Sequence, residues 1–574
     1  MSLLILIIGS LALLLLAYRL YGTFLVRNFR VDDSNPVPSK TMRDGVDFVP
    51  TNPFVVMGHH FSSIAGAGPI VGPVLAGLYF GWAPALAWIL LGAIFVGGVH
   101  DFGSLLASVR HKAGSVADVA RVYMGKWPGR LFLLFIWLAL VYVVIVFLDL
   151  TAGTFAKKGT VATASLLFIG LAVALGLTMR RAGLSMGVTL AIFLPLLFGA
   201  VWAGETFPMS WTPELFGSTK FFWSAVLLVY CFIASVIPVW VLLQPRDFLS
   251  SFLLYGALFG AVTGLVIGAL SPDSLALTWK PFVSAEEIEG FGKAPLGLLF
   301  PFLFITIACG ACSGFHSLVS SGTTARQVKT ETHAFRVGYG AMLVEGFVAV
   351  IALSTVCVLA FEGASFGNPL VVFSAGVGKF LGAVGIPESV GANFAALAVS
   401  TFLLTTLDTC TRLTRYIVQD VLRLSNDKAG NRYLATAIAL VIPAAFAFME
   451  FKDAQGQPIP IWKAIWPIFG ASNQLLAGLS LLTITVWMKR AGRRYMFVAV
   501  PMVLMLSVTL LALFRLAWSQ SWLAGEGAAP FTMIGWIAAA LFVLGCVIAV
   551  LAVKAFGLEP LNEEAGQQGA LQEA

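Results

Sequence analysis

Long apolar stretches follow one another along almost the whole chain, and they constrain the fold more than any other feature. They run from residue 3 to residue 556 with only short polar gaps between them. A helix of about twenty apolar residues crosses the roughly 30 Å hydrocarbon core of a bilayer. The chain is 59% hydrophobic and only 11% charged, so it has too few polar groups to cover a water-soluble surface. We therefore expect a single all-α integral membrane unit.

The spacing of these stretches predicts about fifteen membrane-spanning helices. They are expected near residues 3–22, 54–80, 82–109, 130–153, 162–179, 183–203, 222–243, 251–270, 295–323, 337–361, 391–417, 432–449, 461–488, 495–516 and 531–555. A weaker apolar stretch, 371–384, is expected to form a re-entrant or peripheral helix. If the N-terminus lies outside, about three quarters of the Lys and Arg residues fall on the cytoplasmic side, which follows the positive-inside rule. The same count places the C-terminus in the cytoplasm.

The distribution of charge excludes several classes of partner. Lys and Arg occupy the gaps between apolar runs and form no basic stripe with interleaved aromatic residues, so nucleic acid is not an expected partner. A glycine-rich phosphate-binding loop of the kind that ATP-driven pumps carry is absent from the sequence. The expected partners are the lipid bilayer and a small molecule, and the sequence gives no indication of an oligomeric state.

The second apolar stretch is rich in residues that interrupt helices. Within 54–80 it contains Gly58, Gly66, Gly68, Pro69, Gly72 and Pro73. An unwound segment near Gly66–Pro69 would leave carbonyl and amide groups free at mid-depth, where they bind a solute or an ion. The alternative is a continuous helix with a small-residue packing face and proline kinks. We favour the broken helix.

The seventh stretch, 222–243, repeats this theme around Pro238. It lies five spans after the second, and an odd offset reverses the direction of the chain through the membrane. We therefore expect a five-plus-five inverted repeat, the architecture of amino-acid transporters. The expected divisions are an N-terminal extra helix and loop (1–53), a first repeat (54–210), a second repeat (211–425) and C-terminal accessory helices with a tail (426–574).

Interrupted spans at matching positions of two repeats indicate where a transporter binds its substrate. The expected substrate-binding residues come from the two interrupted segments: His59, His60, Ser62, Ser63, Gly66, Ala67, Gly68, Ile237, Pro238 and Trp240. A half-helix N-terminus at this place would suit a carboxylate.

The ninth stretch presents a polar helical face, with hydroxyl and imidazole groups three or four residues apart. The expected ion-coupling residues are Ser313, His316, Ser317, Ser320 and Ser321. We expect a proton carried by His316, which titrates near neutral pH. A sodium ion at Ser317, Ser320 and Ser321 is the competing interpretation, and hydroxyls that bond only to their own helix are the structural alternative.

Other titratable side chains lie within the expected spans, where they are unfavourable and therefore functional candidates. We expect Asp101 and Asp408 to form a relay, with structural ion pairing as the alternative for both; Asp149 and Glu345 are equally consistent with pairing. The histidines also allow a second hypothesis, a membrane oxidoreductase that holds haem or a metal. The sequence contains no spacing that requires it, so we expect no enzyme, no resident metal and no cofactor beyond the coupling ion, H⁺ or Na⁺.

Several strings of residues resemble the carbon starvation protein A family of bacterial transporters. The resemblance is carried by Gly58-His-His-Phe, by Ile64-Ala-Gly-Ala-Gly-Pro-Ile-Val-Gly-Pro, by Leu-Gln-Pro-Arg246-Asp, by Ser-Gly-Phe-His316, by Leu407-Asp-Thr and by Trp466-Pro-Ile-Phe-Gly-Ala-Ser-Asn473-Gln474. It implies proton- or sodium-coupled import of small peptides or pyruvate, a 2-oxo acid, across the bacterial inner membrane during carbon starvation. Longer family members carry a large insertion where this chain has only residues 362–391, so the resemblance leaves the choice between peptide and pyruvate open.

Overall fold

The structure of the chain is a computed structural model. The structure describes residues 3–43, 48–181, 186–209, 213–238, 240–270, 275–284, 299–359, 368–424, 429–452, 458–519 and 533–559.

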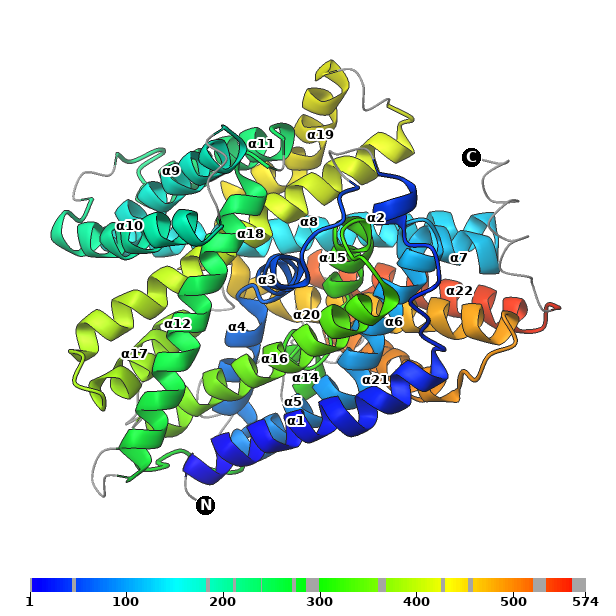
Figure 1. The fold of residues 1–574 in the computed structure, drawn as a ribbon, viewed down its shortest axis with the longest axis horizontal. Coiled ribbons are helices and arrows are strands. Elements are labelled where there is room, and N and C mark those ends of the chain that lie inside the picture. The colour runs from blue at the N-terminus through cyan, green and yellow to red at the C-terminus, as the bar shows by residue number, and fades with distance from the viewer. Residues whose placement is uncertain are drawn as a thin grey trace.

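Helices dominate the described part of the chain, as the apolar stretches predict (Figure 1). The first half contains α1 (Leu3–Asn28), α2 (Pro38–Thr41), α3 (Pro53–Ile64), α4 (Gly68–Phe80), α5 (Trp82–Leu91), a π-helical segment η1 (Gly92–Gly97), α6 (Gly98–Arg110), α7 (Val116–Met124), α8 (Lys126–Lys157), α9 (Gly159–Arg181), α10 (Met186–Thr206), α11 (Thr219–Val236) and α12 (Leu243–Leu270). The second half contains α14 (Leu299–Thr306), α15 (Phe315–Gly322), a 3₁₀ turn η2 (Thr324–Arg326), α16 (Glu331–Val358), α17 (Pro369–Gly382), α18 (Glu388–Val421), α19 (Ala429–Ala447), α20 (Ile461–Arg490), α21 (Met496–Ser519) and α22 (Met533–Phe556). A short hairpin pairs β1 (Phe451–Lys452) with β2 (Pro458–Ile459), Phe451 opposite Ile459.

Thirteen helices in the described ranges are long and apolar enough to cross a membrane, and the bent pair α3–α4 brings the number to 14. The expected ninth span, 295–323, is the remaining one, and it consists of the two short helices α14 and α15. Each of the expected spans therefore corresponds to a helix or to a broken pair of helices. The weaker stretch 371–384 forms α17, a helix of 14 residues, too short to span the membrane alone.

The first break lies where the glycine and proline residues predict it. The side chain of Asn52 accepts a hydrogen bond from the amide of Phe54, which fixes the start of α3. Helix α3 ends at Ile64, and α4 begins at Gly68 with an axis bent by 46°. Pro69 lies in the first turn of α4, where its missing amide proton removes no helical hydrogen bond. The proline thus starts a new half-helix, and the prediction of a broken span 54–80 is confirmed.

The expected second break was assigned to the wrong span. The stretch 222–243 is not interrupted in its middle, because α11 is continuous from Thr219 to Val236 and Pro238 follows its end. A proline disfavours helical geometry at the residue before it, so here it terminates a helix. The second break instead separates α14 from α15, at residues 307–314, where Gly310 adopts a φ of +85° that favours glycine.

Arg246 falls between the expected spans 222–243 and 251–270, so the expected spans place it in a loop, and the structure corrects this. Helix α12 begins at Leu243, several residues earlier than expected, so Arg246 and Asp247 lie within it. Both side chains are fully buried. Arg246 therefore contributes nothing to the positive-inside count and belongs to the interior of the protein.

The helices around the two breaks make pairs of corresponding contacts. Helix α16 packs on α4 and α6, while α6 packs on α15. The two long helices α8 and α18 contact each other, and α20 packs on α8 much as α12 packs on α18. The pair α9–α10 lies to one side of this bundle, at the upper left of Figure 1, and α1 runs along its lower edge.

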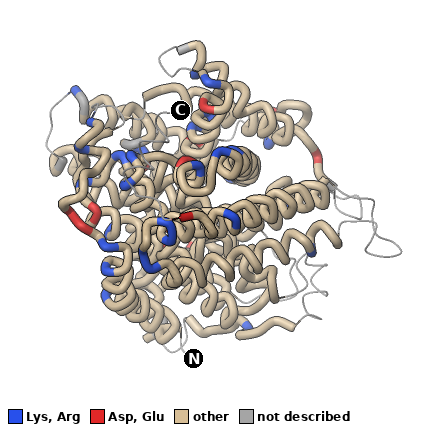
Figure 2. Tube along the Cα trace, turned by 90° about the vertical axis from the view of Figure 1, so that its right-hand side faces the viewer, with Lys and Arg blue, Asp and Glu red and all other residues tan. Residues whose placement is uncertain are grey.

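Basic side chains gather at one end of the bundle, where several helices finish. Arg110 donates to the Phe29 carbonyl at the end of α1 and pairs with Glu331, which is fully buried. In the same region Arg490 donates to the Tyr123 carbonyl at the end of α7, and Lys489 donates to Phe556 at the end of α22. Cations there complement the negative ends of the helix dipoles. Figure 2 shows the molecule from this side, with Lys and Arg at several places across it.

Close packing between the two broken spans leads to a first prediction. A Cβ at Gly72 would lie 2.6 Å from the Thr306 carbonyl oxygen, whereas a Cβ at Gly170 of α9 would meet nothing within 4 Å. We expect Gly72→Ala to lower the free energy of unfolding by about 1–3 kcal/mol, because backbone must shift. The matched change Gly170→Ala is expected to leave stability unchanged or to raise it, since alanine favours helix. Thermal unfolding of the purified variants in detergent measures both, and equal melting temperatures would contradict the packing.

Candidate functional site

The two breaks lie against each other in the interior of the protein. A Cβ at Gly68, the first residue of α4, would collide with the side chain of Cys309, and a Cβ at Gly310 would come within 3.4 Å of Pro69. On its other side the first break faces α18, where the Thr406 hydroxyl would lie 2.6 Å from a Cβ at Gly66. Glycine at these positions lets two unwound segments and a helix approach one another closely.

The end of α14 is capped by a side chain from α20. Gln474 donates from its amide Nε2 to carbonyl oxygens at the end of α14 and just after it, those of Phe304, Ile307 and Ala308, at 3.1, 3.3 and 3.3 Å. A helix leaves its last carbonyls without partners, and water cannot supply them inside a membrane. Gln474 therefore stabilises the broken geometry.

The segment between α14 and α15 is held in the same way. The Asn473 Oδ1 accepts a hydrogen bond from the amide of Phe315, the first residue of α15, at 3.0 Å. The Asn473 Nδ2 donates to the Ser313 hydroxyl at 3.0 Å. The Glu345 carboxylate of α16 accepts from the Gly310 amide at 3.2 Å. Two side chains of α20 and one of α16 thus replace the helical hydrogen bonds that the break removes.

Four titratable side chains form what we call the histidine–carboxylate cluster: His100 and Asp101 of α6, His316 of α15 and Glu345 of α16. His316 Nδ1 lies 2.7 Å from Asp101 Oδ2, and His316 Nε2 lies 3.1 Å from Glu345 Oε2. His100 Nδ1 lies 2.7 Å from Asp101 Oδ1. All four side chains are fully buried. The imidazole of His316 therefore lies between two carboxylates.

A second group, the Arg246 cluster, consists of His59 of α3, Tyr230 of α11, Arg246 and Asp247 of α12, and Asp408 of α18. Arg246 forms a bidentate ion pair with Asp408, with 2.8 Å between Nη2 and Oδ1. The same guanidinium lies 3.0 Å from Asp247, whose other oxygen is 3.1 Å from His59 Nδ1. Tyr230 donates its hydroxyl proton to Asp408 at 3.0 Å.

His60 lies between the two clusters. Its Nδ1 is 2.8 Å from the hydroxyl of Thr324, which follows α15, and its neighbour His59 belongs to the Arg246 cluster. His59 and His60 face different helices, so they do not bind one ligand together as the structure stands. Both residues nevertheless lie on α3, within five residues of its end at Ile64.

The predicted substrate-binding residues fall into two separate places. Ser62 donates to the Asp247 carbonyl and Ser63 to the His59 carbonyl, so both are buried beside the Arg246 cluster. Gly66, Ala67 and Gly68 form the first break itself.

Ile237, Pro238 and Trp240 lie in the connection between α11 and α12. Ile237 packs with Ala172 of α9, and its carbonyl accepts a hydrogen bond from Arg412. The structure therefore does not bring these three residues into the site formed by the breaks. The physical reason is that Pro238 ends α11 instead of opening it.

The predicted ion-coupling residues lie on α15 and the turn before it. The hydroxyls of Ser317 and Ser321 donate to the carbonyls of Gly314 and Ser317, at 2.7 and 2.8 Å. Ser320 is buried one turn beyond His316, and its hydroxyl has no hydrogen-bond partner within the described ranges. Ser104 Oγ and the Nε2 atoms of His60 and His100 also have no hydrogen-bond partner among the described residues. Since buried polar atoms are usually paired, this region has spare capacity for a water molecule or an ion.

One group of side chains has the composition of a metal site. Cys309, His316 and Glu345 place one ligand atom each within 4.8 Å of one another. His316 Nε2 already faces Glu345, so an ion pair accounts for the arrangement. Asp149, the other carboxylate expected to be paired, binds Lys220 and accepts from the Trp462 amide at the start of α20.

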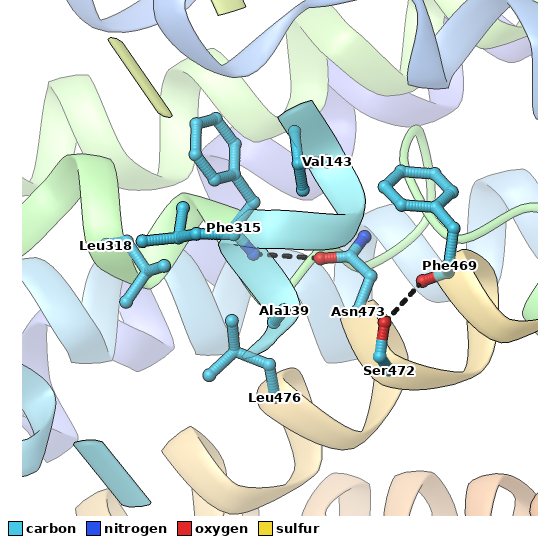
Figure 3. A pocket seen from close by; sticks show the side chains of 9 residues that line it. Ala139, Val143, Phe315, Leu318, Phe469, Ser472, Asn473 and Leu476 are labelled. Atoms are coloured by element: carbon cyan, nitrogen blue, oxygen red, sulfur yellow. Dashed lines mark hydrogen bonds between the residues drawn. The ribbon is translucent and has the colours of Figure 1, made fainter. Parts of the chain in front are cut away.

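A small cavity adjoins the second break. It lies between α8, α15 and α20 and is lined by Leu140, Val143, Phe315, Phe469 and Asn473 among others (Figure 3). The space open to the centre of a water molecule is about 10 Å³, enough for roughly one water. Asn473 points toward Phe315 at its edge, where the dashed hydrogen bond is drawn.

Sequence reasoning missed several residues that the structure places at the site. Asn473 and Gln474 are polar residues in the middle of an apolar stretch, which was a signal that they matter. Arg246 belongs to a string that resembles the family but lies next to an expected helix end, and Tyr230 gave no signal, because tyrosine is common in membrane helices. Their roles depend on contacts with residues more than 150 positions away.

The capping of the second break leads to another prediction. We expect Asn473→Ala to lower the free energy of unfolding by about 1–3 kcal/mol, because it leaves the Phe315 amide and Ser313 without their partner. The neighbouring change Ser472→Ala is the control, since the Ser472 hydroxyl donates only to the Phe469 carbonyl of its own helix. Thermal unfolding in detergent compares the two. If Ser472→Ala destabilises as much as Asn473→Ala, the capping role is wrong.

The arrangement of the helices is similar to that of a solved manganese transporter from Eremococcus coleocola. The two share a TM-score of 0.51 at 12% sequence identity, over 90% of this chain and 99% of that one. The chain thus has the fold of a membrane transporter, an all-α bundle with a five-plus-five inverted-repeat core.

The chain belongs to the family described as carbon starvation protein CstA, which it matches over residues 2–368 and 362–512. It is 33% identical to the peptide transporter CstA of Campylobacter jejuni, over 88% of this chain and 79% of that protein. It is 33% identical to CstA of Bacillus subtilis, over 96% of both chains. It is 31% identical to the pyruvate/proton symporter BtsT of Escherichia coli, over 88% of this chain and 80% of that one. These relatives and the many apolar helices identify a multi-pass bacterial membrane protein, and they favour a transporter over an oxidoreductase.

Proposed function

We propose that the chain imports a small peptide or pyruvate during carbon starvation by symport with protons. The observation that carries this proposal is the position of His316, which lies between Asp101 and Glu345 directly after the second break. A buried imidazole in contact with two carboxylates can exchange a proton, and broken helices are where transporters bind their substrate and coupling ion. The relatives, a peptide transporter and a pyruvate/proton symporter, support the substrate class.

The serine hydroxyls argue for a proton over a sodium ion. Ser317 and Ser321 donate their protons to carbonyls of their own segment, an arrangement that helices adopt without any bound ion. Sodium requires several oxygen ligands that converge on one point. Of the hydroxyls on α15, Ser320 is the one without a hydrogen-bond partner in the described part of the chain.

Proton coupling predicts a specific loss in His316→Gln. In proteoliposomes with an imposed pH gradient, we expect the wild type to accumulate pyruvate or a dipeptide, and His316→Gln to fall to the level of empty liposomes. Glutamine keeps a hydrogen-bonding group but cannot bind the proton. His333→Gln, at the start of α16 and outside the cluster, is the matched control and is expected to retain uptake.

The same assay separates the alternatives. Uptake that follows a sodium gradient, ignores the pH gradient and is lost in Ser320→Ala would replace the proton by sodium. If neither gradient drives uptake of a peptide or of pyruvate by the wild type, the symporter proposal fails.

We also propose a new division of the chain into repeats. The first repeat comprises α3–α4, α5–α6, α8, α11 and α12, and the second comprises α14–α15, α16, α18, α19 and α20. The supporting observation is reciprocal packing, since α8 contacts α11 and α20 as α18 contacts α19 and α12. The short helices α7 and α17 then occupy equivalent places, each before the long helix of its repeat. This division replaces the expected boundaries at 54–210 and 211–425, and makes α9–α10 an insertion in the first repeat.

For the orientation, we propose that the N-terminus is outside and the end of the bundle with Arg110 and Arg490 is cytoplasmic, following the positive-inside rule. In intact cells, a membrane-impermeant maleimide is expected to label Glu214→Cys, between α10 and α11. Lys112→Cys, between α6 and α7, is expected to react only after the cells are made permeable. The native cysteines are buried or half-buried and give a low background. The reverse labelling pattern would invert the orientation.

A further inference from the structure

The Arg246 guanidinium has more hydrogen-bond acceptors around it than a single structural ion pair would supply. Its guanidinium forms a bidentate pair with Asp408, a further ion pair with Asp247 and a 2.5 Å contact with the Tyr230 hydroxyl. All of these side chains except the half-buried Tyr230 have almost no exposed surface. Within the described ranges the Arg246 Nε has no hydrogen-bond partner. The guanidinium is therefore a buried carboxylate-binding group with one donor to spare.

Unless His59 carries a proton, the charges around Arg246 do not balance. One guanidinium faces the two carboxylates of Asp247 and Asp408, and the other titratable groups in contact are His59, 3.1 Å from Asp247, and Tyr230, 3.0 Å from Asp408. Removing charges from water is unfavourable unless they are compensated. A cluster with one carboxylate more than it needs for Arg246 is suited to exchange that carboxylate for another.

The Arg246–Asp408 pair lies close to the first break. Asp247 is tied to α3 by His59 and by Ser62, which donates to its carbonyl at 3.0 Å, and Ser62 lies three residues before the first break. On α18, Thr406 packs against Gly66 of the break, and Asp408 follows two residues later. The Arg246–Asp408 pair thus lies beside the break, where α3, α12 and α18 meet.

We propose that Arg246 is the receptor for the carboxylate of the transported solute, and that Asp408 occupies this receptor when no solute is bound. The proposal rests on the transport function proposed above, and names the chemical class of the solute: a small carboxylate, such as a 2-oxo acid or a peptide with a free C-terminus. The planar guanidinium fork accepts any carboxylate in the same bidentate geometry. When the solute carboxylate binds, Asp408 leaves the fork, takes up a proton so that the cluster gains no further buried negative charge, and keeps the hydrogen bond that Tyr230 donates.

Binding to the purified full-length protein tests this receptor directly. Calorimetry compares pyruvate with pyruvamide, and a dipeptide with the same dipeptide amidated at its C-terminus. We expect the wild type to prefer the carboxylate in each pair by roughly tenfold or more, because a site built for a charged group rejects the analogue that lacks it. In Arg246→Lys the preference is expected to shrink severalfold, since lysine lacks the fork.

Asp408→Asn is the decisive variant, because it is expected to gain affinity. Removing the competing carboxylate should tighten carboxylate binding severalfold and leave amide binding unchanged. A structural ion pair would give the opposite result, a loss of binding with a loss of stability. Arg412→Lys is the matched control: Arg412 is also buried but donates to the carbonyls of Ala234 and Ile237, and its replacement is expected to leave the carboxylate-to-amide ratio unchanged.

The outcomes distinguish this inference from the proposed function. Proton-driven uptake combined with equal affinity for carboxylate and amide would overturn the receptor and leave transport in place. Carboxylate-selective binding that depends on Arg246, without uptake under any gradient, would support the receptor and overturn transport. An Asp408→Asn variant that binds carboxylates more weakly than the wild type would overturn the exchange between Asp408 and the solute.

Discussion

The structure depends on one constraint: backbone hydrogen bonds removed inside a membrane must be replaced by the protein itself. Two spans are interrupted, at residues 65–67 and 307–314, and they are packed against each other. The second interruption is stabilised from outside its own helix, by Gln474 at the end of α14 and by Asn473 at the start of α15. Both come from α20. The break therefore exists only in the folded protein, and its geometry is determined by a helix more than 150 residues further along the chain.

The buried charges follow from the same constraint. Glu345 accepts from the Gly310 amide in the break and faces His316 with its other oxygen, so one carboxylate serves both the backbone and the cluster. His316 in turn is tied to Asp101 of α6. A change in the protonation of this imidazole alters contacts among α6, α15 and α16 at once. In the proposed symport, a local proton is thereby linked to the relative position of helices, which is the requirement for coupling in a transporter.

Much of this architecture could be predicted from the sequence, and the parts that could not share a physical reason. The apolar stretches and the glycine and proline residues around Pro69 predict the spans and the first break, because both are local properties of the backbone. Pro238 misled the assignment of the second break, since a proline ends a helix as readily as it interrupts one. The true second break contains no proline, and its glycines could equally belong to a continuous packing face. Arg246 looked like a loop residue because its partner Asp408 is 162 positions away, and no local pattern reports such a pair.

The two clusters also differ in what they offer to a transport cycle. The histidine–carboxylate cluster joins α6, α15 and α16, which pack around the second break, and it is suited to hold a proton. The Arg246 cluster joins α3, α11, α12 and α18 around the first break and is suited to hold an anion. His60 lies on α3 next to His59 and contacts Thr324, just after α15. If both proposals hold, a proton in one cluster and a carboxylate in the other attract each other in a low-dielectric interior, so each favours the binding of the other. Positive coupling between the two ligands is then the electrostatic consequence of the two proposals taken together.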